Sequence, residues 1–215
     1  MIDIVQVLRN KSTTEEIDLG FIKSCLSEYK YPKDLIKRLL RDKVLIRVKQ
    51  RLFVFGPKYQ RSLIVNETLA NQIYGPSYIS LEYALSYHGV IPERVETITC
   101  VTAKRNKRFD TPVGTFSYRT IPAAAYSAGI QRIEYDATHS ILMASLEKAI
   151  LDKFWLTRRS GIYNLKDFRE FIYDDQRFDE TELRKIKPRL LMEHAKKYDR
   201  VRMLKWATWL KGELG

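Results

Sequence analysis

The stretch YPKDLIKRLLRDKVLIRVKQRLFVFG, residues 31–56, decides the fold of the first part of the chain. Its first half predicts an amphipathic helix that begins at Pro32, because proline suits the first helical position. Four apolar residues at helical spacing form one stripe of that helix: Leu35, Ile36, Leu39 and Leu40. After Asp42 the apolar residues alternate with cations, which predicts a β-hairpin with its turn near residues 49–51.

The cations of this stretch form a candidate binding surface. From Lys30 to Tyr59 the chain carries ten lysines or arginines and only two acids. Residues four apart share a helix face, so a basic row lies beside the apolar stripe. We expect Asp34 to pair with Arg38 across one turn, which leaves Arg38 the less free of the cations. The predicted contact residues are Tyr31, Lys33, Lys37, Arg38, Arg41, Arg47, Lys49 and Arg51.

Two further helices are predicted before this stretch, over residues 2–9 and 17–26, from apolar residues at helical spacing. Three helices followed by a basic hairpin are the layout of a winged helix-turn-helix, whose third helix enters the major groove of DNA. Lysines and arginines at phosphates would release condensed counterions and so supply affinity. A basic helix face can also be an ordinary solvated surface, and that interpretation stays open here.

The composition agrees with a globular protein that binds a polyanion. The 215 residues carry a formal net charge of +12, which favours nucleic acid or an acidic surface as partner. The two cysteines, Cys25 and Cys100, form no metal-type pair and indicate a reducing compartment. The sequence has no apolar run of about 18 residues and no basic leader, so we expect no membrane contact and a cytoplasmic location.

Beyond residue 60 the pattern predicts a second domain. Short strands are expected near residues 78–79, 96–103, 115–121, 130–135 and 140–143, with helices at 62–74, 81–88 and 146–156 and only helices after 165. The predicted fold class is α+β: a winged helix-turn-helix over residues 1–60, then a mixed α/β domain with a helical C-terminal segment over 61–215. A loop between two of these strands is expected to form a second DNA or protein contact, or only a solvated surface, through Lys104, Arg105, Lys107 and Arg108.

Residues 78–121 and 145–152 carry a resemblance to a known family. YISLEYALSYHGVIPERVETITCVTAKRNKRFDTPVGTFSYRTIP, followed by SLEKAILD, resembles the AbiEi antitoxins of type IV toxin–antitoxin systems. The matching themes are a helix like YISLESALSYHGLIP, a strand ending in T.KR.R.F.TP.G.F.Y, and a later EKAL.D helix. They cover about half of the chain, and the last 45 or so residues match no family that we can name.

This resemblance implies a function. Such antitoxins pair an N-terminal winged helix, which represses their own operon by binding operator DNA, with a C-terminal domain that counters a nucleotidyltransferase toxin. Relatives often carry Arg-Gly before Leu-Tyr in the wing, whereas this chain has Arg51 in place of the glycine and Phe53 in place of the tyrosine. The motif of the second domain marks its fold and does not by itself identify toxin contacts.

Two alternative functions are weighed against the antitoxin. A metal-dependent nuclease would need carboxylates that converge beside a lysine, and Glu147, Asp152 and Lys153 are the candidates. Positions i and i+5 lie about 140° apart on a helix, so we expect a helix N-terminal acid and a surface acid instead. The second alternative is a module that binds only protein.

No enzyme is predicted from the motifs. The sequence contains no phosphate-binding, dinucleotide-binding, nucleophile-elbow or zinc-protease motif. We expect no metal site at His139 or His194, because neither has an acid or cysteine at the spacing of metal ligands. His88 fits a structural role at a helix end. We therefore expect no catalytic residue, no metal and no cofactor.

Overall fold

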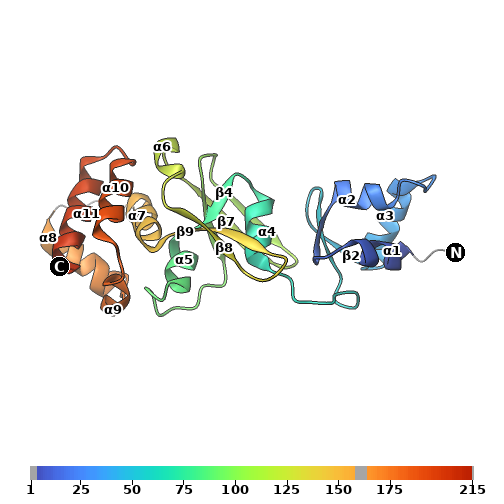
Figure 1. The fold of residues 1–215 in the computed structure, drawn as a ribbon, viewed down its shortest axis with the longest axis horizontal. Helices are drawn as coiled ribbons and strands as arrows, with labels where there is room; N and C mark the ends of the chain where they lie inside the picture. The colour runs from blue at the N-terminus through green and yellow to red at the C-terminus, as the bar shows by residue number, and fades with distance from the viewer. Residues whose placement is uncertain (1–3, 158–163, 215) are drawn as a thin grey trace.

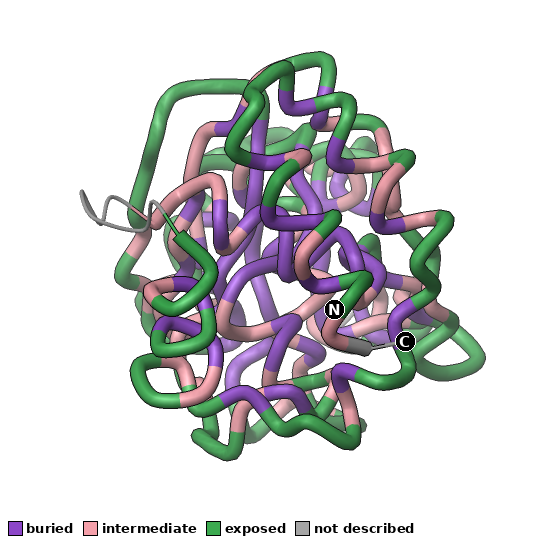
Figure 2. Tube along the Cα trace, turned by 90° about the vertical axis from the view of Figure 1, so that its left-hand side faces the viewer, coloured by how far each residue is buried: buried purple, intermediate pink, exposed green. Residues whose placement is uncertain are grey.

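The computed structural model describes residues 4–157 and 164–214, and it mixes α-helices with β-strands (Figure 1). Helices and a small sheet form one end of the elongated molecule, a larger sheet lies in the middle, and the C-terminal helices form the other end. Buried residues occupy the interior while exposed segments form the outer loops and helix faces (Figure 2). The N-terminal elements are α1 (Ile4–Lys11), β1 (Glu16–Asp18), α2 (Leu19–Cys25), α3 (Pro32–Arg41), β2 (Leu45–Lys49) and β3 (Leu52–Phe55).

The three helices and the hairpin of the N-terminal part are present as predicted, with one correction. The second helix does not start at Ile17, because that residue lies in β1 and pairs with Phe53 of β3. Asp18 ends this strand and caps α2: its side chain accepts a hydrogen bond of 2.7 Å from the Phe21 amide. The strands form an antiparallel sheet in the order β1-β3-β2.

Strand β3 joins two hydrophobic clusters. Phe53 and Phe55 pack with the helices of the N-terminal part, where Ile36 and Leu39 of α3 are buried as expected. Leu52 and Val54 instead join the larger cluster of the rest of the chain. Since side chains alternate between the faces of a strand, the small sheet is covered on both faces.

The hairpin turns at residues 50–51, as predicted. Arg51 adopts a φ of 71°, the left-handed region that favours glycine. Its carbonyl accepts a hydrogen bond of 2.9 Å from the Leu19 amide, which ties the turn to the start of α2. The register shifts between Arg47 and Lys49, so a β-bulge precedes the turn.

The larger sheet is mixed and six-stranded, in the order β6-β7-β5-β4-β9-β8, with parallel pairs β4–β9 and β5–β7. The expected strands are present, and the structure adds one, because residues 107–111 form β6 where the sequence predicted only a loop. Phe109 packs against Tyr118 while Lys107, Arg108 and Asp110 stay exposed, so charge concealed an edge strand. The strands are β4 (Ser77–Ile79), β5 (Ile98–Thr102), β6 (Lys107–Thr111), β7 (Gly114–Thr120), β8 (Ile130–Glu134) and β9 (Ser140–Ala144).

Helices flank this sheet and complete the chain. Two serines that precede helices differ: Ser145 caps its helix by accepting a hydrogen bond from the Lys148 amide, whereas the Ser80 side chain makes no cap bond. Trp206 is buried. The helices are α4 (Asn66–Ile73), α5 (Leu81–Tyr87), α6 (Ala123–Tyr126), α7 (Leu146–Leu156), α8 (Leu165–Arg169), the π-helical segment η1 (Glu170–Asp175), α9 (Glu180–Leu183), α10 (Pro188–Lys196) and α11 (Val201–Leu214).

Candidate nucleic-acid interface

Helix α3 presents a basic face to solvent. Its apolar stripe faces the N-terminal cluster, so the cations between those positions point outward. Lys37 and Arg41 have 80% and 75% of their side-chain surface exposed, and Tyr31 at the helix start is 65% exposed. Lys33 and Arg38 are exposed as well. The structure therefore gathers all five α3 residues of the predicted contact set at the surface.

The ion pairs on this face differ from the prediction. Asp34 lies 3.4 Å from the Lys37 ammonium, not beside Arg38, and Asp42 lies 3.1 Å from Nε of Arg41. Within the described part of the chain, no acid pairs with Arg38. Exposed ion pairs of this kind contribute about 0–1 kcal/mol, so a phosphate could replace either acid.

The hairpin contributes two exposed cations. The Arg47 guanidinium lies 5.7 Å from the centre of the Phe53 ring, a cation–π contact that restricts its position. Arg51 is exposed at the tip of the turn.

Lys49, the third predicted hairpin contact, is directed elsewhere. Its ammonium donates a hydrogen bond to the Ile73 carbonyl at the end of α4 and lies 5.5 Å from the Phe109 ring. Burial, and then the nearby charges of Lys107 and Lys104, lower the pKa of Lys49. We therefore correct its assignment and leave Lys49 out of the proposed DNA contacts.

The predicted second basic site lies partly in strand β6, and several of its cations already contact other residues of the chain. Lys104 donates a hydrogen bond of 2.6 Å to the Gly75 carbonyl, and both Lys104 and Lys107 lie within 6 Å of the Tyr74 ring. Arg108 pairs with Asp110 at 3.1 Å on the exposed edge strand β6. Arg105 is exposed. The structure thus brings Lys104 and Lys107 next to Lys49, which no local pattern in the sequence indicated.

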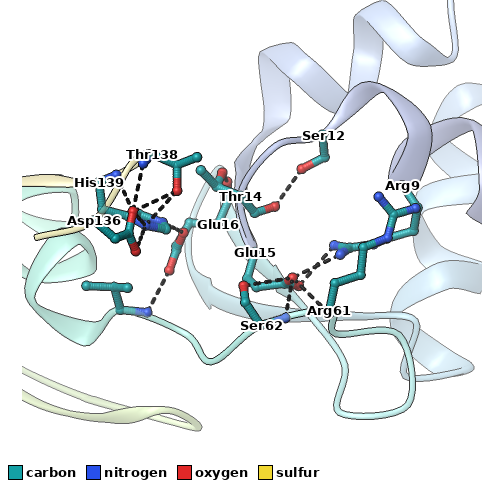
Figure 3. Close-up of polar contacts among 11 residues, drawn as sticks. Arg9, Ser12, Thr14, Glu15, Glu16, Arg61, Ser62, Asp136, Thr138 and His139 are labelled. Atoms are coloured by element: carbon teal, nitrogen blue, oxygen red, sulfur yellow. Dashed lines mark hydrogen bonds and ion pairs between the residues drawn. The ribbon is translucent and has the colours of Figure 1, made fainter.

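Two buried carboxylates fasten the N-terminal part to the rest of the chain (Figure 3). Glu15 accepts two hydrogen bonds of 2.9 Å from Arg9 and also accepts from the amides of Arg61 and Ser62. Burial alone would raise the pKa of Glu15, but the bonds from Arg9 and Arg61 outweigh it and lower the pKa. The expected helix over 62–74 starts only at Asn66, because the amides of Arg61, Ser62 and Val65 donate to the Glu15 and Glu16 carboxylates instead.

Glu16 points the other way, toward the larger sheet (Figure 3). One oxygen accepts from the Val65 amide at 3.0 Å, and the other lies 3.1 Å from Nε2 of His139. Nδ1 of His139 lies 2.7 Å from Asp136, so the imidazole bridges two carboxylates. Sequence reasoning missed this site, although Asp136 three residues before His139 was an available signal.

The candidate nuclease acids have structural roles. Asp152 is fully buried, not at the surface as expected, and it lies 2.9 Å from the buried Lys148 ammonium. Tyr78, Ser80 and Tyr198 donate hydrogen bonds to the same carboxylate. Glu147 is also buried and accepts from the Lys187 amide at 2.9 Å. These acids have their partners inside the chain and do not converge on a common point.

Other chemical groups are placed as follows. Over residues 4–157 and 164–214, no group of three or more histidine, cysteine or acidic side chains could hold a metal ion. Cys25 and Cys100 are both buried and unpaired with each other, and burial raises the pKa of Cys100. A search of the described helices finds none that is long and apolar enough to span a membrane. Nε2 of His88 lies 2.9 Å from the Ala144 carbonyl, in keeping with a structural role.

Comparison with known proteins adds no assignment: no protein-family model matches the chain, and no curated protein matches it significantly.

Proposed function

We propose that this chain is a DNA-binding regulator of the antitoxin type, whose first 60 residues act as a winged helix-turn-helix. The observation that carries the proposal is the two-sided character of α3. Its Ile36 and Leu39 are buried in the N-terminal cluster, and its cations face solvent, as do Arg47 and Arg51 of the hairpin. Cations on a helix that is anchored from behind can approach a duplex without unfolding anything.

In this proposal α3 enters the major groove and the hairpin lies on the backbone. Lys33, Lys37 and Arg41 neutralise phosphates, with Arg38 free of any acid in the described residues and well suited to a base edge. Arg47 and Arg51 contact the neighbouring backbone, and the Tyr31 hydroxyl adds a hydrogen bond to a phosphate. The surface ion pairs to Asp34 and Asp42 are exchanged for phosphate pairs when DNA binds.

The antitoxin half of the proposal is supported by the resemblance of residues 78–121 and 145–152 to AbiEi antitoxins. Within the EKAL.D-like helix, Lys148 and Asp152 form a buried ion pair. A buried ion pair within the motif agrees with a motif whose residues stabilise the fold. We propose that the chain represses its own operon in the cytoplasm and counteracts a nucleotidyltransferase toxin.

Two experiments test the two halves separately. Footprinting of the purified chain on the DNA upstream of its gene should protect a discrete site, and uniform weak protection would contradict the regulator. Coexpression with a nucleotidyltransferase encoded beside the gene should restore growth that the toxin alone arrests. If growth stays arrested while the chain is produced at normal levels, the antitoxin half is wrong.

A further inference from the structure

A groove of about 820 Å³ opens where the large sheet meets the C-terminal helices. One wall is the segment after β5, another is the end of β7, and the opposite side is formed by the end of α7 and the start of α11. Five cations from these separate elements line it: Lys104, Arg105, Arg119, Arg200 and Arg202. Lys104 and Arg105 belong to the basic run of residues 104–108.

The groove concentrates positive charge, and the acid close to one of its cations is Glu82, which lines a neighbouring cavity together with Arg119. Among its lining residues in the described segments there is no aspartate or glutamate. Concave surfaces lined by one sign of charge focus the electrostatic field and raise the local concentration of counterions. Helix α11 begins at this groove with no acid in its first turn, so its dipole adds to the same field.

Arg119, which lines both this groove and the neighbouring cavity, carries a buried donor that is not hydrogen-bonded. Its Nε atom is buried and has no hydrogen-bond partner among the residues that the structure describes. A buried donor without an acceptor costs about 1–3 kcal/mol, so native structures rarely leave one unpaired. An anionic oxygen in the groove would supply that acceptor.

The arginines opposite Arg119 are held in place before any ligand arrives. The guanidinium groups of Arg200 and Arg202 lie 5.8 and 5.7 Å from the centre of the Trp155 ring. Arg202 also donates a hydrogen bond of 3.1 Å to the Trp155 carbonyl. Planar guanidinium groups that are already ordered lose less entropy when they bind phosphate.

We propose that this groove binds the phosphate backbone of single-stranded nucleic acid, as a site separate from the α3 face. A duplex is a wide, stiff rod that rests on a surface, whereas a single strand can follow a recessed basic groove. Arg119, Arg200 and Arg202 contact phosphate oxygens, and Arg105 extends the contact along the strand. This site goes beyond operator recognition, because it lies on the second domain.

The test measures binding of the full chain to fluorescent 12-nucleotide single strands, as DNA and as RNA of one sequence, across a salt series. The variant Arg105→Gln/Arg200→Gln removes two groove charges at exposed positions. Its matched control, Lys196→Gln/Lys197→Gln, removes two exposed charges at the end of α10. Thermal unfolding verifies that both variants are folded.

The groove variant should bind about tenfold more weakly at low salt and lower the slope of log K against log salt by about 1.4, since each phosphate contact contributes about 0.7 for a single strand. The control should bind like the wild type. Equal loss in both variants, or no loss in the groove variant, would overturn the proposal. The proposal would also be overturned if the wild type bound no single strand, or if the groove variant weakened only duplex binding.

Comparing the DNA strand with the RNA strand shows which of the two the groove prefers. A variant of α3 tests whether the groove binds independently of the proposed duplex-binding face. Lys33→Gln/Lys37→Gln should weaken duplex binding and leave single-strand binding unchanged. If it abolishes both, the groove has no role of its own.

Discussion

Nε2 of His139 lies 3.1 Å from Oε2 of Glu16, a contact between residues 123 positions apart in the chain. Both side chains are buried, and the second oxygen of Glu16 accepts from the Val65 amide. The contact therefore links the small sheet, the connecting segment and the large sheet at one point. It makes the attachment of the proposed DNA-binding part depend on an ionisable group.

The first prediction concerns pH. Burial alone would lower the pKa of His139, but the hydrogen bonds to Asp136 and Glu16 outweigh it and raise the pKa. A raised pKa in the folded state gives stability that is complete below the unfolded pKa of about 6.5 and is lost as pH rises through the folded pKa. The difference in unfolding free energy between wild type and His139→Gln should thus be larger at pH 6 than at pH 8.

Urea unfolding at several pH values measures that difference. Ala137→Gln is the control, because Ala137 is exposed two positions before His139 and its side chain carries no hydrogen-bonding group. A difference between wild type and His139→Gln that is constant from pH 6 to pH 8 would show that folding does not shift the pKa of His139, and it would contradict the prediction.

The second prediction concerns the buried ion pair of Lys148 and Asp152. Replacing Lys148 by methionine should destabilise the fold by about 3–5 kcal/mol, because the Asp152 charge loses its only cationic partner among the described residues. Chemical denaturation gives the loss directly. The control replaces Lys153, the residue after Asp152, by methionine. Lys153 is half-buried and pairs with Glu82, and its replacement should lower the free energy of unfolding much less. Comparable losses in the two variants would contradict this account of the buried pair.

The third prediction concerns the hairpin turn. Arg51→Gly should stabilise the fold by about 0.5–1 kcal/mol, because glycine adopts the φ of 71° without steric cost. Thermal unfolding would detect the gain. Arg51→Asn also tolerates this conformation and likewise removes the charge, so both variants should bind DNA slightly more weakly than wild type. If Arg51→Gly is less stable than wild type, the turn is not strained.

The fourth prediction separates Lys49 from the exposed hairpin cations. Lys49→Gln should leave duplex affinity within twofold of wild type, since its ammonium faces the Ile73 carbonyl and Phe109. Arg47→Gln should instead lower the slope of log K against log salt by about 0.9. Anisotropy titrations of both variants on one duplex compare them. If both variants lower the slope of log K against log salt by the same amount, Lys49 contacts DNA after all.

Local pattern predicted most of the N-terminal elements because each depends on neighbouring residues. Pro32, the apolar stripe of α3 and the alternation after Asp42 specify a helix and a hairpin without reference to the rest of the chain. Strand β6 was missed because an edge strand tolerates charge on its exposed face, and Lys107, Arg108 and Asp110 resemble a loop.

The features that depend on distant residues could not be predicted. Asp152 was expected at the surface because its helical position says nothing of Tyr78, Ser80 and Tyr198, which come from other elements and enclose it. In the same way, Lys49 alternates correctly with Arg47 and Arg51, yet the bulge before the turn and the nearby α4 redirect its side chain. The basic groove needs four chain segments to meet, which no spacing in the sequence encodes.

The most direct test of the central claim is the salt dependence of binding to the upstream duplex by wild type and by Lys33→Gln/Lys37→Gln/Arg41→Gln. If α3 binds the duplex, the variant should stay folded, lose specific affinity and show a slope of log K against log salt that is smaller by about 2.7, from three contacts of about 0.9 each. A folded variant that binds with the wild-type affinity and slope would show that the basic face of α3 is only a solvated surface.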